Sequence, residues 1–389
     1  MTRRRQTLTR REWWLLLGIL LLILAYQIAT SPDSQPDAAA VPVPPTATTG
    51  VGAPPTPTTR PSERIQIFLT TPDLVYPDVA SERPTVPVLT AFLADIAAAR
   101  ERIDIAVFDI DLAPLGDALV AAQRRGVAVR LVYDDENLSD ARVAKLIGKL
   151  QDAGVTVRSD QREPFMHEKT AVFDTRIVWT GSWNMTANDT YRNNNNMVRI
   201  ESPAMARGFV AEADQLVAGL FGVHKAESAP QREIRIGKRQ VAWHFSPQDS
   251  INRRVVAQID AAVSDIAFMA FSYTDPAIAR AMVRAQKRGV TVHGVMEKQN
   301  SAGTGSAYDT LLRGKVDIVV DGNCYIMHHK TIIIDDATVI TGSYNFTKSA
   351  EQSNDESLIV LSDPASVAVY RDEYARVRTQ ADAPTACAR

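Results

Sequence analysis

One short pattern of side chains that can transfer protons and bind anions occurs twice in this sequence. Each copy has a histidine, a lysine two positions later, and a Gly-Ser-x-Asn run that begins 14 residues after the histidine. The first copy supplies His167, Lys169, Ser182 and Asn184, and the second supplies His328, Lys330, Ser343 and Asn345. A single copy would mean little, so the repetition is what suggests two half-sites of one active centre.

The alternation of side chains along a β-strand decides which of these groups can act together. Thr170–Phe173 has the composition of a strand and is followed by a turn. We expect His167 and Lys169 to share one face of this strand, with Glu168 on the other face. The second copy has the same parity, so each half is predicted to present one imidazole and one ammonium group together.

Such a set of side chains suits the cleavage of a phosphate diester. Two lysines and two asparagines, with the two serine hydroxyls, would donate to the nonbridging oxygens and neutralise their charge. One imidazole would attack phosphorus and become phosphohistidine, while the other would protonate the leaving alcohol and then activate water. We therefore predict Ser182, Asn184, Ser343 and Asn345 as substrate-binding residues. The sequence has no ligand set with metal spacing, so neither a metal nor a cofactor is expected.

Each copy also contains an aspartate five residues after the lysine, namely Asp174 and Asp335. These aspartates have the opposite strand parity from the histidines. We interpret them as turn or second-layer residues rather than as groups that contact the substrate.

The duplication extends beyond the motif. The run Ala122–Val129 is repeated as Ala285–Val292, and each is preceded by an apolar run, Ile103–Phe108 and Ile266–Phe271. The period of roughly 160 residues is that of a domain-sized unit rather than a solenoid repeat. Both halves therefore have the same order of elements.

Strands and helices alternate within each half, which favours an α/β fold with mixed, mostly parallel sheets. We predict a first half over residues 63–225 and a second half over 226–385. Neither half holds a complete catalytic set, so we expect them to pack about a pseudo-twofold axis with the active site at their interface. Two independent domains are the alternative.

The chain resembles the phospholipase D superfamily, whose signature is H-x-K-x4-D followed by G-S-x-N. Both copies match that signature, and the resemblance covers about residues 63–385. It implies paired α/β halves with one shared active site. The superfamily includes phospholipases D, cardiolipin synthases and hydrolases, and metal-independent endonucleases, so the motif does not identify the substrate.

The resemblance also implies a polar residue that reaches across to orient the other half's histidine. The matching positions here are Glu356 and Asn195, so the first copy departs from the acidic pattern. By this reasoning Glu356 serves His167 and Asn195 serves His328. Because a carboxylate stabilises imidazolium and helps a nucleophile, we predict His167 as the nucleophile and His328 as the general acid and base.

The front of the chain is predicted to attach the catalytic part to a membrane. Residues 1–12 contain five arginines and form a cytoplasmic basic segment, and Trp13–Ala29 is an uncharged apolar run. We expect this run to be a transmembrane anchor, with a cleaved secretory signal as the alternative. Residues 30–62 are rich in proline and threonine and are predicted to be a disordered linker. The catalytic part would then lie outside the cytoplasm, anchored or secreted.

The sequence does not decide between classes of substrate. We predict a phospholipase D acting on phospholipid head groups; the alternatives are an exported endonuclease of DNA or RNA, a phosphatidyl transferase like cardiolipin synthase, and a non-catalytic binding module. The net charge of −2 gives no overall basic field for nucleic acid. We expect a monomeric catalytic unit. The two cysteines, Cys324 and Cys387, either pair or remain as free thiols.

Overall fold

The computed structural model describes residues 65–70, 86–227 and 232–384. The predicted basic segment, anchor and linker over residues 1–62 lie outside the described residues, as does Cys387. Cys324 is disulfide-bonded. No helix in the described ranges combines the length and apolar character that crossing a bilayer requires.

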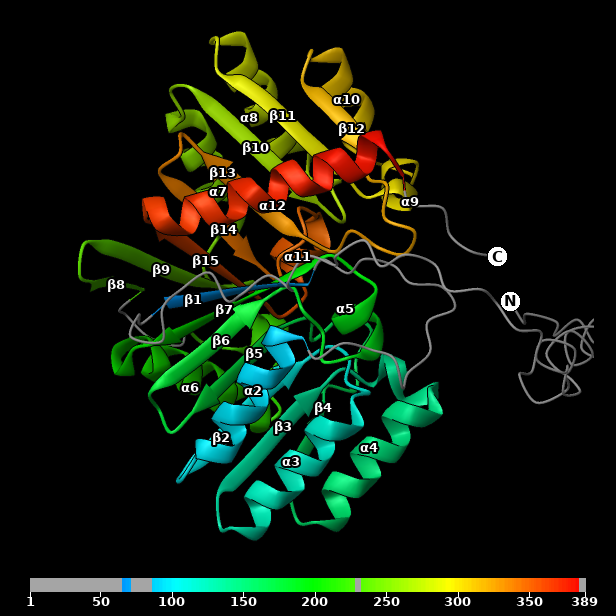
Figure 1. The fold of residues 1–389 in the computed structure, drawn as a ribbon, viewed down its shortest axis with the longest axis vertical. Helices are drawn as coiled ribbons and strands as arrows, with labels where there is room; N and C mark the ends of the chain where they lie inside the picture. Colours follow the sequence, from blue (N-terminus) through cyan, green and yellow to red (C-terminus); the bar gives the residue numbers. More distant parts are fainter. Residues whose placement is uncertain (1–64, 71–85, 228–231, 385–389) are drawn as a thin grey trace, which may run out of the picture. The chain divides into compact units, whose positions relative to one another are not determined.

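The first half consists of a seven-stranded sheet with helices packed on it (Figure 1). The strands lie in the order β1-β7-β6-β5-β2-β3-β4. The strands are β1 (Ile65–Thr70), β2 (Arg102–Val107), β3 (Ala128–Tyr133), β4 (Thr156–Ser159), β5 (Lys169–Phe173), β6 (Ile177–Gly181) and β7 (Asn195–Glu201). The helices are α2 (Pro87–Ala98), α3 (Ala113–Arg124), α4 (Ala141–Asp152), α5 (Ala187–Tyr191) and α6 (Pro203–Val217).

The second half repeats this arrangement in an eight-stranded sheet of order β12-β11-β10-β13-β14-β15-β9-β8, in which β8 has no counterpart among the described strands of the first half. Its strands are β8 (Glu233–Ile236), β9 (Arg239–Ser246), β10 (Asp265–Ala270), β11 (Thr291–Met296), β12 (Asp317–Val320), β13 (Lys330–Ile334), β14 (Thr338–Gly342) and β15 (Glu356–Ser362). Its helices are α7 (Ile251–Ala261), α8 (Pro276–Lys287), α9 (Lys298–Ser301), α10 (Tyr308–Arg313), α11 (Lys348–Gln352) and α12 (Pro364–Asp382).

Both sheets are mixed, as predicted, but the expectation that they are mostly parallel is wrong. Only β2, β3 and β4, and their counterparts β10, β11 and β12, pair in parallel among the described strands. All other described pairings are antiparallel, including β5 with β6 and β13 with β14. The physical reason is the connection length. A tight turn such as 174–176 can join only antiparallel strands, whereas helices such as α3 and α8 provide the crossovers that parallel pairs need.

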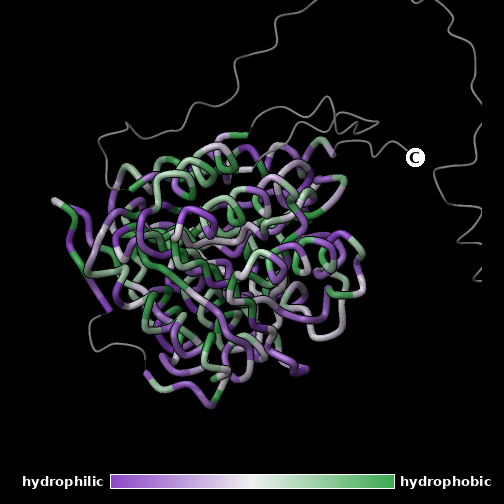
Figure 2. Tube along the Cα trace, turned by 90° about the horizontal axis from the view of Figure 1, so that it is seen from below, coloured by the Kyte–Doolittle hydropathy of each residue, from purple (hydrophilic) through white to green (hydrophobic). Residues whose placement is uncertain are grey.

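The three largest hydrophobic clusters of the described residues hold the elements together. One lies between the first sheet and helices α2, α3 and α4, and another lies between the second sheet and helices α7, α8 and α10. The third joins the two halves: it combines residues of both sheets, such as Val198 and Ile359, with Phe209 of α6 and Tyr370 of α12. Figure 2 shows hydrophobic stretches running through the interior of the trace. Burial of apolar surface in this shared cluster fixes one half against the other.

Candidate active site

The two His-x-Lys segments lie at the junction between the halves, where each pairs with backbone of the other half. The N–H of His167 donates to the carbonyl of Asp355 at 2.9 Å, and the N–H of His328 donates to the carbonyl of Asn194 at 2.9 Å. Both contacts belong to isolated bridges between the halves. Each histidine therefore lies two residues before a strand of its own half, β5 or β13, and beside the residue that precedes β15 or β7 in the other half.

His167 is held by a carboxylate from the second half. Its Nδ1 lies 2.8 Å from Oε2 of Glu356. The same Oε2 accepts a hydrogen bond from the hydroxyl of Ser343 at 2.7 Å, and Asn354 donates to Oε1 at 3.2 Å. Because a carboxylate can only accept, the proton of the neutral imidazole belongs on Nδ1, which leaves the Nε2 lone pair free to react.

His328 is held in the corresponding way by an amide. Its Nδ1 lies 2.9 Å from Oδ1 of Asn195 and 3.1 Å from the carbonyl of Ser182. The hydroxyl of Ser182 donates to the same Oδ1 at 2.9 Å, so that this oxygen can only accept from the ring. A carboxylate that the sequence reasoning did not single out, Asp189, lies 3.6 Å from Nδ1. Nothing in the local sequence around this aspartate pointed to the site.

The two lysines sit beside the histidines in almost identical settings. Lys169 Nζ donates to the carbonyl of His167 at 2.7 Å, and Lys330 Nζ donates to the carbonyl of His328 at 2.8 Å. Both lysines are essentially buried, with 0% and 2% of their surface exposed. Each ammonium group thus shares its site with the imidazole two residues before it.

Two phenylalanines that the sequence analysis did not single out complete these settings. The ring of Phe108 packs edge-on against His167 at 5.0 Å and lies 5.0 Å from Lys169 Nζ. Phe271 makes the same contacts with His328 at 4.7 Å and with Lys330 at 4.4 Å. The sequence feature that could have identified them is their position, because each phenylalanine is the last residue of one of the duplicated apolar runs.

The electrostatics of the site favour a bound anion. Burial lowers the pKa of His167 to about 4 although Glu356 opposes the shift, and burial lowers the pKa of Lys169 to about 8. The pKa values of His328 and Lys330 lie well below their ordinary values, first because of burial and then because neighbouring lysines repel a further positive charge. An anion between these groups would offset both causes.

The two motif serines contact the residues that orient the histidines. Ser182 and Ser343 are fully buried, and their hydroxyls bind the orienting residues Asn195 and Glu356. Asn195 likewise lies behind His328. These three side chains therefore position the imidazoles, and the prediction that Ser182, Ser343 and Asn195 bind substrate stays a prediction. The tight turn after β6 and β14 directs each hydroxyl at the adjacent strand.

The motif asparagines are the better candidates for contact with substrate. The side-chain oxygens of Asn184 and Asn345 are buried and have no hydrogen-bond partner in the described part of the chain. Each lies two residues after the serine of its copy of the motif. Buried amides without partners are costly unless a ligand satisfies them.

Asp174 and Asp335 lie at the far ends of β5 and β13 from the histidines. Asp174 accepts hydrogen bonds from the backbone N–H groups of residues 100–102, and Asp335 does the same for residues 263–265. These N–H bonds offset burial and lower the pKa of both carboxyl groups. Both aspartates have positive φ, at 50° and 52°. They occupy turns, where they bind backbone and not a neighbouring histidine.

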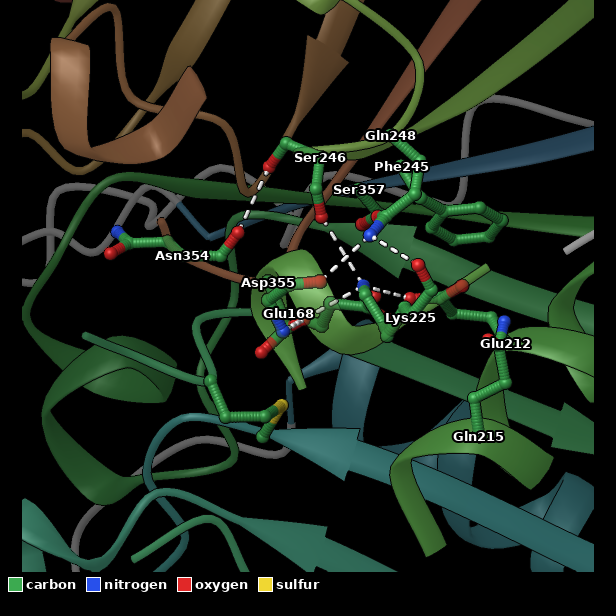
Figure 3. A network of polar contacts seen from close by, with 12 residues as sticks. Glu168, Glu212, Gln215, Lys225, Phe245, Ser246, Gln248, Asn354, Asp355 and Ser357 are labelled. Atoms are coloured by element: carbon green, nitrogen blue, oxygen red, sulfur yellow. Dashed lines mark hydrogen bonds and ion pairs between the residues drawn. The ribbon is translucent and has the colours of Figure 1, made fainter. Parts of the chain in front are cut away.

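A buried network of charged side chains locks the His167 segment to the second half (Figure 3). Lys225 Nζ lies 2.8 Å from Asp355 Oδ1 and also pairs with Glu212, and Asp355 pairs with Arg162. Glu168, on the face opposite to His167, lies in the same network, and burial raises its pKa well above the ordinary value. The network therefore surrounds the backbone contact between His167 and Asp355.

One group of carboxylates in the described ranges has the spacing to hold a metal ion: Asp134, Asp135 and Asp160. Asp134 already accepts the backbone N–H groups of Met166 and Glu136. Arg162 Nε lies 3.4 Å from Asp160 Oδ2. These contacts are suited to fixing the loop that precedes His167, so we assign no catalytic step to this group.

The comparisons with known proteins agree with this geometry. Residues 92–217 and 255–378 match the family described as "Cardiolipin synthase, PLD-like domain". The chain is 30% identical to a phospholipase D of Rickettsia typhi over 46% of this chain and 93% of that protein. It is 31% identical to a mitochondrial cardiolipin hydrolase of Xenopus laevis over 38% of this chain and 70% of that protein.

A solved structure extends the likeness of fold to both halves. The phosphatidylserine synthase of Haemophilus influenzae Rd KW20 matches 75% of this chain and 84% of its own, with a TM-score of 0.57 and 13% identity. The family match covers both halves separately, and the duplicated α/β architecture is the one predicted. The chain belongs to the phospholipase D superfamily, as a member with two cardiolipin synthase-type PLD-like halves.

Proposed function

We propose that this chain is a metal-independent phospholipase D that hydrolyses phospholipid head groups through a phosphohistidine intermediate. The observation that carries the proposal is the exchange of orienting residues between the halves. Glu356 holds His167 at 2.8 Å and Asn195 holds His328 at 2.9 Å, so both imidazoles keep Nε2 free for chemistry. Two nearby lysines supply the charge that a phosphodiester requires.

In the proposed reaction, Nε2 of His167 attacks phosphorus while the bond from phosphorus to the head-group oxygen breaks. His328 enters this step as imidazolium, with its Nδ1–H held by Asn195, and donates its Nε2 proton to that oxygen, so the alcohol leaves neutral. His328 then removes a proton from water, whose oxygen attacks phosphorus and breaks the phosphorus–nitrogen bond. Phosphatidic acid is released and both imidazoles return to their starting states. If another alcohol replaces water in this second step, the same intermediate gives phosphatidyl transfer.

The charges around the lysines favour a lipid over a nucleic acid. Besides Glu356, the carboxylates of Asp109, Asp134 and Asp189 act on Lys169. Glu297 acts on Lys330. A single phosphodiester can be neutralised inside this site, but the further phosphates of a nucleic acid strand would meet these negative charges. We also propose that residues 13–29 hold a monomeric catalytic unit close to its membrane substrate.

The test is an assay of the fragment that begins at residue 63 and of the full chain. The substrates are phosphatidylcholine, cardiolipin, single-stranded DNA and a nitrophenyl phosphodiester, each with and without EDTA. We expect phosphatidic acid from phosphatidylcholine, at a rate that EDTA leaves unchanged. Nicking of DNA without lipid cleavage would instead establish the endonuclease, and a new phosphatidyl alcohol in the presence of added glycerol would establish transfer. Complete loss of activity in EDTA would refute the metal-free mechanism.

A further inference from the structure

We propose that Asp189 is the carboxylate partner of His328 and takes the part of the acidic residue that is absent at position 195. This inference rests on the proposed function, in which His328 is the general acid. Asp189 acts through the imidazole and is therefore a positioning residue.

The first support is the arrangement of oxygens around one nitrogen. Nδ1 of His328 faces the side-chain oxygen of Asn195 at 2.9 Å, the carbonyl of Ser182 at 3.1 Å and Oδ2 of Asp189 at 3.6 Å. Oxygens that accept hydrogen bonds stabilise a proton on Nδ1, and a charged oxygen does so most strongly in a buried site. Asp189 supplies that charge, and only 3% of its surface is exposed.

The second support is the comparison of the two halves. Counterparts in the repeat are separated by 161 residues, as His167 is from His328. Glu356 corresponds to Asn195, and the counterpart of Asp189 is Ala350. Each half therefore provides one acid for the other half's histidine, but from different positions. In the second half the acid begins β15, whereas in the first half it lies on α5.

The third support is the way in which Asp189 is held. Its Oδ2 accepts the backbone N–H of Asn184 at 2.7 Å, and its Oδ1 accepts the amide of Asn193 at 2.5 Å. The backbone carbonyl of Asp189 accepts from the amide of Asn195 at 3.3 Å, so the two residues that face His328 are also tied to each other. These bonds fix the carboxylate in place before any substrate binds.

The need for a carboxylate follows from the other charges around His328. Lys330 from its own strand, and Lys169 and His167 from the first half, all disfavour a second positive charge there. Asp109 and Asp111, in the loop after β2, are acidic neighbours of Asp189, and their negative charges repel its own. A general acid must hold its proton until the alcohol leaves, and Asp189 opposes the repulsion from the two lysines.

The experiment compares the full-length wild type with Asp189→Asn on two phosphodiesters. One substrate has an alkyl alcohol as leaving group and needs a general acid, and the other has p-nitrophenol and does not. We expect kcat/KM for the alkyl substrate to fall about tenfold or more beyond any fall for the nitrophenyl substrate. In Asp189→Asn, the alkaline limb of the pH–activity profile for the alkyl substrate should also move to lower pH. Activity is lost as pH rises through the pKa of the general acid His328, and the variant lowers that pKa.

Two further variants separate this role from a purely structural one. The double variant Asp189→Asn with Asn195→Glu restores an acid at the position that mirrors Glu356. It should restore kcat/KM for the alkyl substrate and leave the nitrophenyl substrate little changed. The surface variant Asp117→Asn makes the same acid-to-amide change far from any histidine contact and should behave as wild type. Equal losses on both substrates, or no loss on either, would overturn the proposal.

The outcome remains distinguishable from a failure of the proposed function. Wild type that cleaves no phosphodiester would refute the function, whereas the pKa of His328 can still be measured by NMR of labelled histidine in wild type and variant. We expect that pKa to be lower in Asp189→Asn, and an unchanged value would refute the role of Asp189. If Asp189→Asn does not fold, Asp189→Ser keeps an acceptor for Asn184 and carries the same expectations.

Discussion

Glu356 of the second half lies with its Oε2 2.8 Å from Nδ1 of His167 in the first half. This contact makes the active centre a property of the paired halves, because the group that orients each imidazole comes from the other half. The contact from Asn195 to His328 at 2.9 Å repeats the exchange in the opposite direction. Separating the halves would remove both orienting groups at once.

The first prediction concerns the two histidines. Either His167→Ala or His328→Ala should lower turnover by about 10³-fold or more, because each removes a reacting group. Rapid acid-free quenching of wild type with labelled substrate should trap phosphorus on His167. Label on His328 would reverse the assignment of the roles, and full activity of either single variant would contradict the shared site. Circular dichroism should show that both variants remain folded.

The second prediction is that Lys169→Met is inactive but more stable than wild type. Burial lowers the pKa of Lys169 from 10.5 to about 8, so the folded state binds this proton less strongly than the unfolded state does. At 1.36 kcal/mol per unit, and with loss of the hydrogen bond to His167, we expect a gain of about 1–2 kcal/mol. The gain should be complete below pH 8 and should fade as the pH rises towards 10.5.

Thermal unfolding with and without a phosphate analogue measures this effect. Tungstate should raise the melting temperature of wild type more than that of Lys169→Met, because the variant lacks one of the two ammonium groups that bind the anion. A variant less stable than wild type at neutral pH would show that burial of this lysine does not oppose folding.

The third prediction concerns the buried network in Figure 3. Lys225→Met should lower the free energy of unfolding by about 3–5 kcal/mol, because Glu212 and Asp355 would be left buried without their common partner. Burial by itself would lower the pKa of Lys225, but those two carboxylates outweigh it and raise the pKa. Urea unfolding measures the change.

The matched control for this network is Lys149→Met, which removes an exposed ion pair with Asp117. That change should cost less than about 1 kcal/mol, because surface pairs are screened by water and salt. Similar losses in the two variants would mean that the buried network contributes no more than a surface contact.

The fourth prediction tests how closely the halves pack. A Cβ atom at Gly208 of α6 would lie 2.8 Å from Nε1 of Trp243 on β9. Trp243 is fully buried and belongs to the second half. Gly208→Ala should therefore lower the free energy of unfolding by about 1 kcal/mol. Overpacking costs about 1–3 kcal/mol, and the gain in helix propensity offsets about 1 kcal/mol of this.

The control for that packing is Gly148→Ala in α4, where a new Cβ would meet no atom within 4 Å. It should stabilise the protein by about 0.5–1 kcal/mol through helix propensity alone. Denaturant midpoints of the two variants should therefore move in opposite directions. A shift of both towards higher stability would show that α6 can move away from the tryptophan without cost.

Residue types and spacing were enough to identify the reacting groups and the duplication. His167 and His328 stood out because a motif with fixed internal spacing occurs twice, and spacing along a strand fixes which neighbours share a face. The pairing of Glu356 with His167 followed from the family resemblance, and the contact is present in the structure. Local pattern was sufficient for the motif and its strand parity because these depend on residues that are close in the chain.

The contacts of the two serines and of Asp189 became visible only in the folded chain. Ser182 and Ser343 have the residue type of substrate ligands, yet the turns direct their hydroxyls at Asn195 and Glu356. Asp189 reaches a histidine 139 positions away in the sequence, at 3.6 Å. Contacts of this kind arise from the packing of the two halves, which brings together residues whose own sequence neighbourhoods carry no sign of one another. The strand directions had the same origin, because they depend on how each connection crosses the sheet.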